Sequence, residues 1–281
     1  MGTTYTPFRY PGGKSRFRPL LERVLGESGL SDITYVEPFA GGAGAALGLL
    51  FKDKVSRVVL NDADPCIAAA WRAILNHREE LCDRIRSVSV DLDEWGKQKA
   101  VVKGRSGTDI ELGFATLFVN RCARSGILRK SGPIGGKGQN GTYRIDARFN
   151  RDTLCRKIKM IAESSDHIEF HSLDAEELLS SLGNREDRER LFVYLDPPYY
   201  HRGQYLYMNA YDHAGHESLA GTVKALGVPW LMSYDNCDEI RELYAGCIVE
   251  EKELYYSAQR RRVATEIIIS SAETVRVEQP A

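Results

Sequence analysis

An aspartate, two prolines and two tyrosines follow a short apolar run in the stretch LFVYLDPPYY, residues 191–200. Two consecutive prolines remove two backbone donors and fix two φ angles, so neither a strand nor a helix continues through them. The DPPY segment, residues 196–199, therefore holds a carboxylate rigidly beside an aromatic ring. This arrangement suits a planar ring that carries an amino group. The Asp196 carboxylate and the Pro197 carbonyl would accept its hydrogens, and Tyr199 would stack on the ring.

An amino group conjugated to such a ring is a poor nucleophile, because its lone pair is delocalised. Two well-placed acceptors draw the nitrogen toward tetrahedral geometry and free that lone pair, so Asp196, Pro197 and Tyr199 are candidate catalytic residues. A lone Asp-Pro-Pro can also be only a stiff turn. Its position after an apolar strand favours catalysis, because open α/β sheets bind ligands at the carboxyl ends of their strands.

A second strand end is expected in ITYVEPFAGGAGAALGLL, residues 33–50. The order of strand, glycine turn and helix is typical of α/β folds that bind nucleotides. The dinucleotide fingerprint fails, however, because its third glycine would stand at Leu47. Glu37 at the strand end suits a ligand with a positive charge and an apolar face. A glycine turn used only for packing is the alternative.

A third strand end lies in VSRVVLNDADP, residues 55–65, where acids follow the strand. An acid at this place in nucleotide-binding folds accepts hydrogen bonds from ribose hydroxyls. Alternatively, Asp62 or Asp64 caps the next helix, which has Pro65 at its first position. Both can hold, with one aspartate in each role.

The alternation of strands and helices stops between residues 77 and 166. Helical patterns at 78–87, at 108–124 and at about 150–163 surround a segment too rich in Gly and Pro for a helix or strand interior, SGPIGGKGQNG. Strands resume with HIEFH, LFVYL, VPWLMSY and RVATEIIIS, the last expected to be antiparallel at the sheet edge. We therefore predict one domain from residues 1–76 and 167–281, interrupted by an insertion at 77–166.

Composition sets broad limits. With 281 residues, 43% of them hydrophobic and 27% charged, the chain is typical of a soluble globular enzyme. It has no apolar run of membrane-spanning length and no signal-peptide core, so we expect a cytoplasmic protein. Its six cysteines are scattered, without a C-x-x-C pair or a clustered histidine, which argues against disulfides and a metal site.

A basic window is hidden in the formal net charge of −1. The segment from Arg121 to Arg148 contains seven basic residues against one acid, Asp146. It is either a solvated loop with a chance charge cluster or a flexible loop that follows a phosphate backbone. The basic residues are Arg121, Arg124, Arg129, Lys130, Lys137, Arg144 and Arg148.

Four motifs together resemble the Dam-type, or D12 class, of adenine-specific DNA methyltransferases: FRYPGGK, VEPFAGGAG, LNDADP and LDPPYY, in the order of that family. Weaker agreement in LFVNRCARSGI, GTYRIDARFN, YLYMNAY and YSAQRRR extends the resemblance over nearly the whole chain. The resemblance implies an α/β fold, a Rossmann-like methyltransferase sheet with an inserted helical and β-hairpin DNA-recognition region. It also implies S-adenosylmethionine as the methyl donor and double-stranded DNA as the partner.

The resemblance assigns roles to residues of this chain. Asp196, Pro197 and Tyr199 would take a target adenine flipped out of the duplex. Transfer from a sulfonium is a direct displacement, for which no metal is expected. DNA contacts would come from the seven basic residues of the window. Cofactor binding would come from Tyr10 and Lys14 at the methionine end, Glu37, Phe39, Gly41 and Gly44 along the methionine part, Asp62 at the ribose and Asp174 at the cofactor adenine.

Three alternatives stay open. Cytosine-N4 methylation uses the same chemistry, but that class usually has Ser in place of Asp196. RNA adenine methylation and a catalytically idle DNA-binding module are the others. The chain inserts RKSGPIGGKGQNGTYRIDAR where better-known members have a short hairpin, so their target sequence does not carry over. Pairing with a cognate restriction endonuclease is an alternative to an orphan enzyme.

Overall fold

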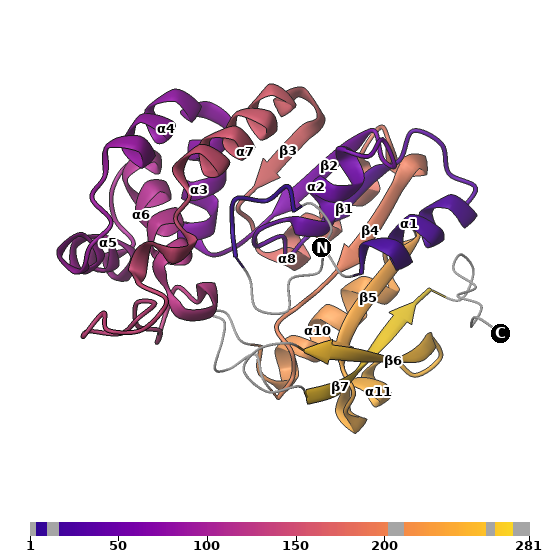
Figure 1. Cartoon of the computed structure of the whole chain (residues 1–281). Helices are drawn as coiled ribbons and strands as arrows, with labels where there is room; N and C mark the ends of the chain where they lie inside the picture. The colour runs from indigo at the N-terminus through magenta and orange to yellow at the C-terminus, as the bar shows by residue number, and fades with distance from the viewer. Residues whose placement is uncertain (1–3, 10–16, 202–210, 257–261, 272–281) are drawn as a thin grey trace. The chain divides into compact units, whose positions relative to one another are not determined.

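Short apolar strands alternate with helices along much of the chain (Figure 1). The computed structural model describes residues 4–9, 17–201, 211–256 and 262–271, without the side chains of residues 253–265. The strands are β1 (Thr34–Glu37), β2 (Arg57–Asn61), β3 (Ile168–His171), β4 (Leu191–Leu195), β5 (Trp230–Asp235), β6 (Ile248–Tyr256) and β7 (Arg262–Ser270). Each strand expected from the sequence is present, and β6 is an additional one.

The longer helices carry the expected signals at their starts. A proline stands in the first turn of α3, and a threonine capping box opens α6. The helices are α1 (Arg18–Glu27), α2 (Gly44–Leu50), α3 (Pro65–Asn76), α4 (Arg78–Ser87), α5 (Leu92–Gly104), α6 (Asp109–Cys122), α7 (Arg151–Glu163), α8 (Ala175–Ser181), α10 (His213–Lys224) and α11 (Asp238–Leu243).

Chain contacts divide the molecule into two units. The helical unit contains Met1–Gly13 and Asp64–Ser172, and the sheet unit contains Lys14–Ala63 and Leu173–Ala281. Helix α3 belongs to the helical unit because it packs against α6 and α7. The functional division into a catalytic domain of residues 1–76 and 167–281 and a recognition insertion of 77–166 stays a prediction.

Six of the seven strands lie in the sheet unit, in the order β2-β1-β4-β5-β7-β6. Strands β2, β1, β4 and β5 are parallel, and β7 is antiparallel to both β5 and β6. The order of strands along the chain reverses between β1 and β4, which is where open α/β sheets bind ligands. This topology confirms the predicted α/β class with a Rossmann-like sheet.

The predicted edge position of RVATEIIIS is wrong, because β7 is an inner strand between β5 and β6. The sequence of β6, IVEEKELYY, carries four charged residues and therefore lacks the apolar run by which buried strands are found. It forms a strand because all nine of its residues pair with β7. The antiparallel direction of β7 is confirmed.

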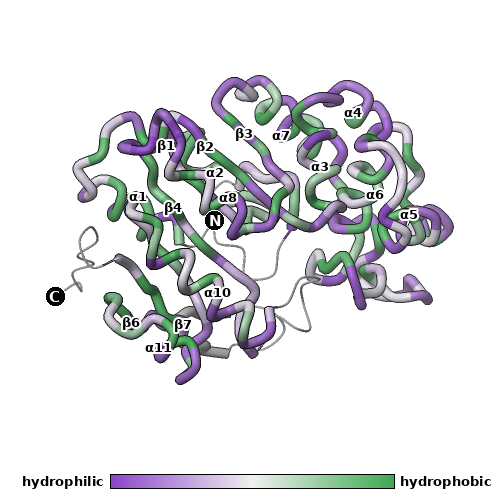
Figure 2. Tube along the Cα trace, turned by 180° about the vertical axis from the view of Figure 1, so that it is seen from behind, coloured by the Kyte–Doolittle hydropathy of each residue, from purple (hydrophilic) through white to green (hydrophobic). Residues whose placement is uncertain are grey.

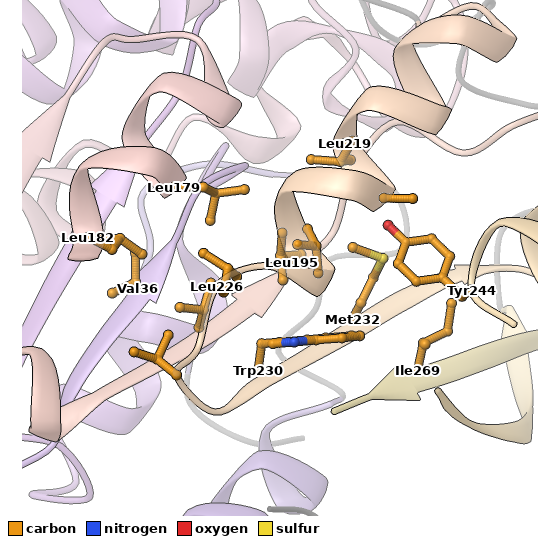
Figure 3. Packing of buried hydrophobic residues seen from close by; sticks show 14 of the residues in the cluster. Val36, Leu179, Leu182, Leu195, Leu219, Leu226, Trp230, Met232, Tyr244 and Ile269 are labelled. Atoms are coloured by element: carbon orange, nitrogen blue, oxygen red, sulfur yellow. The ribbon is translucent and has the colours of Figure 1, made fainter. Parts of the chain in front are cut away.

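Strand alternation divides side chains between the two faces of the sheet. On one face, Val36, Leu195 and Met232 pack with Leu179 of α8 and Leu219 of α10 (Figure 3). The opposite face is aromatic. There, Tyr35 stacks between Phe192 and Tyr194 with ring centroids 6.4 Å apart in both pairs. Burial of both faces explains why these strands are almost continuously apolar.

The helical unit is built around α6, which is buried along most of its length. The outer helix α4 is mostly hydrophilic by comparison (Figure 2). Helix α5 was not expected from the sequence, because only Trp95 and Val102 of its residues are buried and its apolar periodicity is weak. The β-hairpin predicted in this region is wrong. The β-structure of residues 77–166 is limited to an isolated bridge between Ala123 and Pro133. The Gly- and Pro-rich segment lacks the apolar alternation that paired strands need.

Within the described residues, no helix has both the length and the apolar character needed to cross a membrane.

Candidate active site and basic loop

The loops after β1 and β2 and before α8 are tied together by one buried side chain, Asn61. Its amide nitrogen donates to the carbonyls of Pro38 (3.0 Å) and Leu173 (3.1 Å). Its amide oxygen accepts from the backbone N–H of Leu173 at 2.9 Å. Because Asn61 is fully buried, replacing it would leave several polar groups without partners. The strand ends that carry the predicted cofactor residues are therefore fixed by Asn61.

A set of polar side chains lies on the aromatic face of the sheet, toward the carboxyl ends of the parallel strands. Strand register places Ser233 of β5 beside the position that follows β4, which is Asp196. Glu37 shares its face with Tyr35 and Tyr194 by the same alternation. The site is thus assembled from alternate residues of neighbouring strands.

Asp196 accepts a hydrogen bond from the neighbouring strand β5. Its Oδ1 accepts from Ser233 Oγ at 3.1 Å, and Ser233 Oγ lies 3.0 Å from the hydroxyl of Tyr194. Tyr194 and Ser233 are fully buried, and Pro197 and Pro198, which follow Asp196, are buried as well. The carboxylate is therefore restrained both by the proline-fixed backbone and by the hydrogen bond that its Oδ1 accepts from Ser233.

Tyr199 is half-buried and is also held at its polar end. Its hydroxyl hydrogen bonds to the carboxylate of Glu266, a buried residue of β7. Its ring lies 6.1 Å from the ring of Tyr234. Burial first, and then the nearby charge of Asp196, raise the pKa of Tyr199 well above its usual range, so the phenol stays protonated. Tyr199 can serve as a fixed aromatic surface and not as a base.

Glu37 is buried at the end of β1, and its environment favours the neutral acid. Burial, and then the charge of Asp196, raise the pKa of Glu37 to about 8. Its Oε1 lies 3.5 Å from the hydroxyl of Tyr35. Its Oε2 is buried and has no hydrogen-bond partner among the described residues. A cationic group placed against Oε2 would stabilise the carboxylate.

The glycine turn after β1 is joined to the end of β2. The backbone N–H of Gly41 donates to Asp62 Oδ2 at 2.9 Å, and Gly41 has a φ of +48°. Phe39, at the start of this turn, meets the ring of Tyr211 edge-on with centroids 6.3 Å apart. Gly44 is the first residue of α2. Asp62 therefore stabilises the glycine turn, in addition to any ligand that it binds.

Two other aspartates serve as helix caps. Asp64 accepts from the backbone N–H of Cys66 at 2.9 Å and caps α3. Asp174 accepts from the backbone N–H of Glu176 at 2.9 Å and caps α8, while its side chain remains exposed. The predicted cofactor residues Tyr10 and Lys14 lie outside the described residues.

The basic loop, residues 123–150 between α6 and α7, is built mainly on hydrogen bonds to its backbone. Gln139 donates to the carbonyls of Ile134 (2.8 Å) and Gly136 (2.6 Å) and accepts from the N–H of Ile145 at 2.8 Å. Lys99 of α5 donates to the carbonyls of Leu128 and Ser131. The loop therefore has a fixed path although it lacks strands.

Gly126 at the start of the loop cannot be replaced without rearrangement. Its φ is +75°, and a Cβ built on it would lie 2.2 Å from the carbonyl oxygen of Arg9. The same place is fixed by buried Asn120, which donates to the carbonyls of Arg9 and Gly126. The loop is thus anchored where it leaves α6.

The predicted DNA-binding residues divide into two groups. Arg121 is half-buried and donates to the carbonyl of Arg148 at 2.7 Å, and burial lowers its pKa to about 10. Arg124 is exposed and donates to the carbonyl of Pro133 at 3.4 Å. Of the other five, Arg129 is half-buried, and the exposed ones are Lys130, Lys137, Arg144 and Arg148. Two of the seven basic residues thus donate hydrogen bonds to the backbone of the loop, and four of the other five are exposed on it.

The family model of the D12 class of N6 adenine-specific DNA methyltransferases matches residues 10–261, which is most of the chain. The chain belongs to this family. It is therefore a DNA adenine-N6 methyltransferase, its substrate is DNA, and it requires a methyl donor.

Two individual proteins are also similar to this methyltransferase. The Type II methyltransferase M.MjaIII of Methanocaldococcus jannaschii is 22% identical over 219 residues, which cover 69% of this chain and 68% of that protein. The structure of the rRNA methyltransferase aviRa from Streptomyces viridochromogenes aligns with 14% identity, a TM-score of 0.40 and coverage of 93% of this chain and 86% of that one. This second likeness is too weak to carry an argument.

Four residues that contact the predicted site of the methyltransferase were not singled out from the sequence: Tyr194, Ser233, Glu266 and Tyr211. For the first two, the signal was available. Tyr194 shares a strand face with Asp196 by alternation, and Ser233 is the polar residue near the end of the next strand, WLMSYD. The pairing of Glu266 with Tyr199 depends on the inner position of β7, which the sequence did not predict.

One group of metal-ligand types also lies near the DPPY segment. Ligand atoms of His201, Cys237 and Glu239 lie within 4.8 Å of one another. Three such groups are fewer than the four that closed structural zinc sites use. We therefore assign this group of side chains no role in methyl transfer.

Proposed function

We propose that this methyltransferase uses S-adenosylmethionine to methylate the N6 amino group of an adenine flipped out of a specific sequence in double-stranded DNA. The observation that carries the proposal is the restrained Asp196 carboxylate, beyond β4 and at the reversal of strand order beside β1. An adenine inside the duplex cannot present its amino group to a recessed carboxylate, so the base must leave the stack.

The residues at the strand ends fit S-adenosylmethionine, which supplies a methyl group on a sulfonium when bound. Glu37 offers a buried carboxyl oxygen without a partner among the described residues, suited to the positive charge of the methionine part. Phe39 and the glycine turn with Gly41 and Gly44 give that part an apolar, close-fitting surface. Asp62 is proposed for the ribose, as the acid at the end of β2.

The remaining cofactor assignments rest on the family resemblance. Exposed Asp174 is proposed to accept from the amino group of the cofactor adenine. Tyr10 and Lys14 are proposed to hold the methionine end, with the Lys14 ammonium near its carboxylate.

The reaction proposed for the site is a single displacement. The amino group of the target adenine donates one hydrogen bond to the Asp196 carboxylate and one to the Pro197 carbonyl, while Tyr199 stacks on the base. Its nitrogen lone pair, freed from conjugation, forms the new N–C bond as the C–S bond breaks. The surplus amino proton then leaves by way of Asp196 to solvent. The protein contributes positioning and charge stabilisation.

The basic loop is proposed to contact the DNA. Exposed Lys130 and Lys137 are assigned to phosphates, and Arg129 or Arg144 to bases, because the arginine fork can pair with guanine in the major groove. Arg148 is proposed as a further contact, whereas Arg121 and Arg124 are proposed to act mainly by supporting the loop. Tyr143, which is 63% exposed and has Arg148 over its ring, adds an aromatic surface to this loop.

The alternative functions fit the site less well than adenine methylation in DNA. Cytosine-N4 transfer fits less well because Asp196, and not Ser, precedes the prolines. A catalytically idle module does not account for the side chains that restrain Asp196. RNA adenine methylation fits less well, because the family to which the chain belongs methylates DNA. A cytoplasmic location and a cognate restriction endonuclease stay predictions.

The test is methyl transfer from labelled S-adenosylmethionine to duplex DNA, followed by digestion to nucleosides. We expect N6-methyladenine, and sequencing for modified adenine should give one recognition sequence. Label in N4-methylcytosine, or preference for an RNA of the same sequence, would replace the proposal by the corresponding alternative. No transfer to any nucleic acid by folded, cofactor-bound protein would favour the idle module.

A further inference from the structure

Asp196 stands at the end of a chain of two buried hydroxyl groups. Tyr194 Oη and Ser233 Oγ are 3.0 Å apart, and Ser233 Oγ and Asp196 Oδ1 are 3.1 Å apart. Tyr194 and Ser233 come from adjacent strands, β4 and β5, and both are fully excluded from solvent. No water can therefore replace either hydroxyl without displacing packed side chains.

The direction of the hydrogen bonds in this chain follows from the number of protons. An ionised carboxylate only accepts, so Ser233 must give Asp196 its single hydroxyl proton. Ser233 Oγ is then left as the acceptor for the proton of Tyr194. Burial and the nearby charge of Asp196 keep the phenol protonated, since they raise the pKa of Tyr194 well above its usual range. Each hydroxyl thus has one defined role.

We propose that Ser233 is a positioning residue that orients the Asp196 carboxylate toward the target amino group, and that Tyr194 fixes the orientation of Ser233. The proposal rests on the function proposed above and deepens it. With Oδ1 directed at Ser233, the plane of the carboxylate is set, and so is the direction in which it can accept from a substrate. Without Ser233, the proline-fixed backbone still places Asp196, but its side chain loses the hydrogen bond that orients Oδ1.

The first test is Ser233→Ala, with Ser56→Ala as the matched control. Ser56 also donates one hydrogen bond, to the carbonyl of Ile33 at 3.0 Å, but it lies before β2, at the opposite end of the strands. We expect Ser233→Ala to lower kcat by about ten- to a hundredfold, as a small misplacement of a catalytic group does. KM for DNA and cofactor affinity should stay close to wild type, and the melting temperature should fall modestly, because the buried Tyr194 hydroxyl loses its hydrogen bond to Ser233. Ser233→Thr, which keeps the hydroxyl, should restore most of kcat.

The second test is Tyr194→Phe, with Tyr244→Phe as its control. The Tyr244 hydroxyl is buried without a hydrogen-bond partner among the described residues, so its loss removes no such bond. We expect a smaller fall in kcat for Tyr194→Phe and none for Tyr244→Phe. In a Ser233→Ala background, Tyr194→Phe should have almost no further effect, because it acts only through Ser233.

Two results would overturn the proposal. One is a folded Ser233→Ala enzyme with wild-type kcat. The other is a loss of activity that Ser233→Thr does not restore and that parallels a loss of melting temperature, which would make Ser233 only structural. A wild-type enzyme that does not methylate adenine at all would instead refute the proposed function.

Discussion

In the DPPY segment the structure restrains a reactive side chain, whereas in the basic loop it restrains a backbone. Asp196 is bound through its own carboxylate oxygen, by a buried serine. The loop is bound through its carbonyls and N–H groups, by Gln139 and Lys99, and most of its cations stay exposed. Methyl transfer requires the catalytic carboxylate to be positioned accurately against the target amino group, because a small displacement of a catalytic group strongly lowers the rate. Contact with a phosphate backbone tolerates mobile cations on a fixed support, because the attraction is long-ranged.

The largest effect is expected from Asp196→Ala, which removes the restrained group itself. Methyl transfer should fall by about a thousandfold or more, while cofactor and DNA binding largely survive. Asp238→Ala, which removes an exposed carboxylate in the first turn of α11, is the control. Single-turnover rates of both variants measure the difference. A rate for Asp196→Ala within tenfold of wild type would remove this residue from the reaction.

A second prediction concerns the pH dependence of stability. Glu37 has a folded-state pKa of about 8, against 4.5 when unfolded, so the folded state binds more protons between these values. Its contribution is therefore fully present below about pH 4.5 and is lost as the pH rises toward 8, by a few kcal/mol in total. Glu37→Gln should flatten this slope, measured by urea unfolding at several pH values. An unchanged slope would mean that Glu37 is ionised in the free protein.

The sequence was sufficient for features that are local or periodic. The DPPY strand, the glycine turn after β1 and the cap at Asp64 follow from short patterns, and the structure has all of them. The sequence was insufficient where pairing decides the outcome. Strand β6 is charged and is a strand because β7 pairs with it, and Glu266 reaches Tyr199 only because β7 is an inner strand. Likewise, nothing in the composition of the basic window separates supporting Arg121 from exposed Lys137.

A third prediction separates the two aspartates that follow β2. Asp62→Ala should weaken cofactor binding by about 1.5–3 kcal/mol, the usual cost of a lost charged hydrogen bond. Asp64→Ala, the matched control, should lower stability by about 1 kcal/mol through its lost helix cap and leave cofactor affinity unchanged. Titration calorimetry and thermal melting measure the two quantities. Equal cofactor affinity in the two variants would leave Asp62 with the glycine turn as its only role.

The smallest effects are expected on the basic loop, because its cations act additively. Lys130→Ala and Lys137→Ala should each weaken binding to all DNA sequences alike and reduce the salt slope of binding by about one unit. Lys103→Ala, an exposed lysine of α5 outside the loop, is the control. Arg129→Ala or Arg144→Ala should instead lose about 1–3 kcal/mol only on the recognised sequence.

These loop variants can also contradict the comparison. If Gln139→Ala, which removes bonds to the loop backbone, changed neither DNA affinity nor site preference, a fixed loop path would be unnecessary for binding. If no alanine change in the loop had an effect, DNA recognition would have to come from the helices of the helical unit.

The sheet unit is discontinuous in the chain, and this has a consequence for synthesis on the ribosome. Strand β1 pairs with β2 on one side and with β4 on the other, but β4 follows the whole segment Asp64–Ser172. Until β4 emerges, one edge of β1 has no strand to pair with, and such edges are prone to aggregation. The helical unit, whose last residue Ser172 precedes β4, can fold first. A nascent chain stalled between the two strands would therefore combine a folded helical unit with an open, aggregation-prone edge at β1.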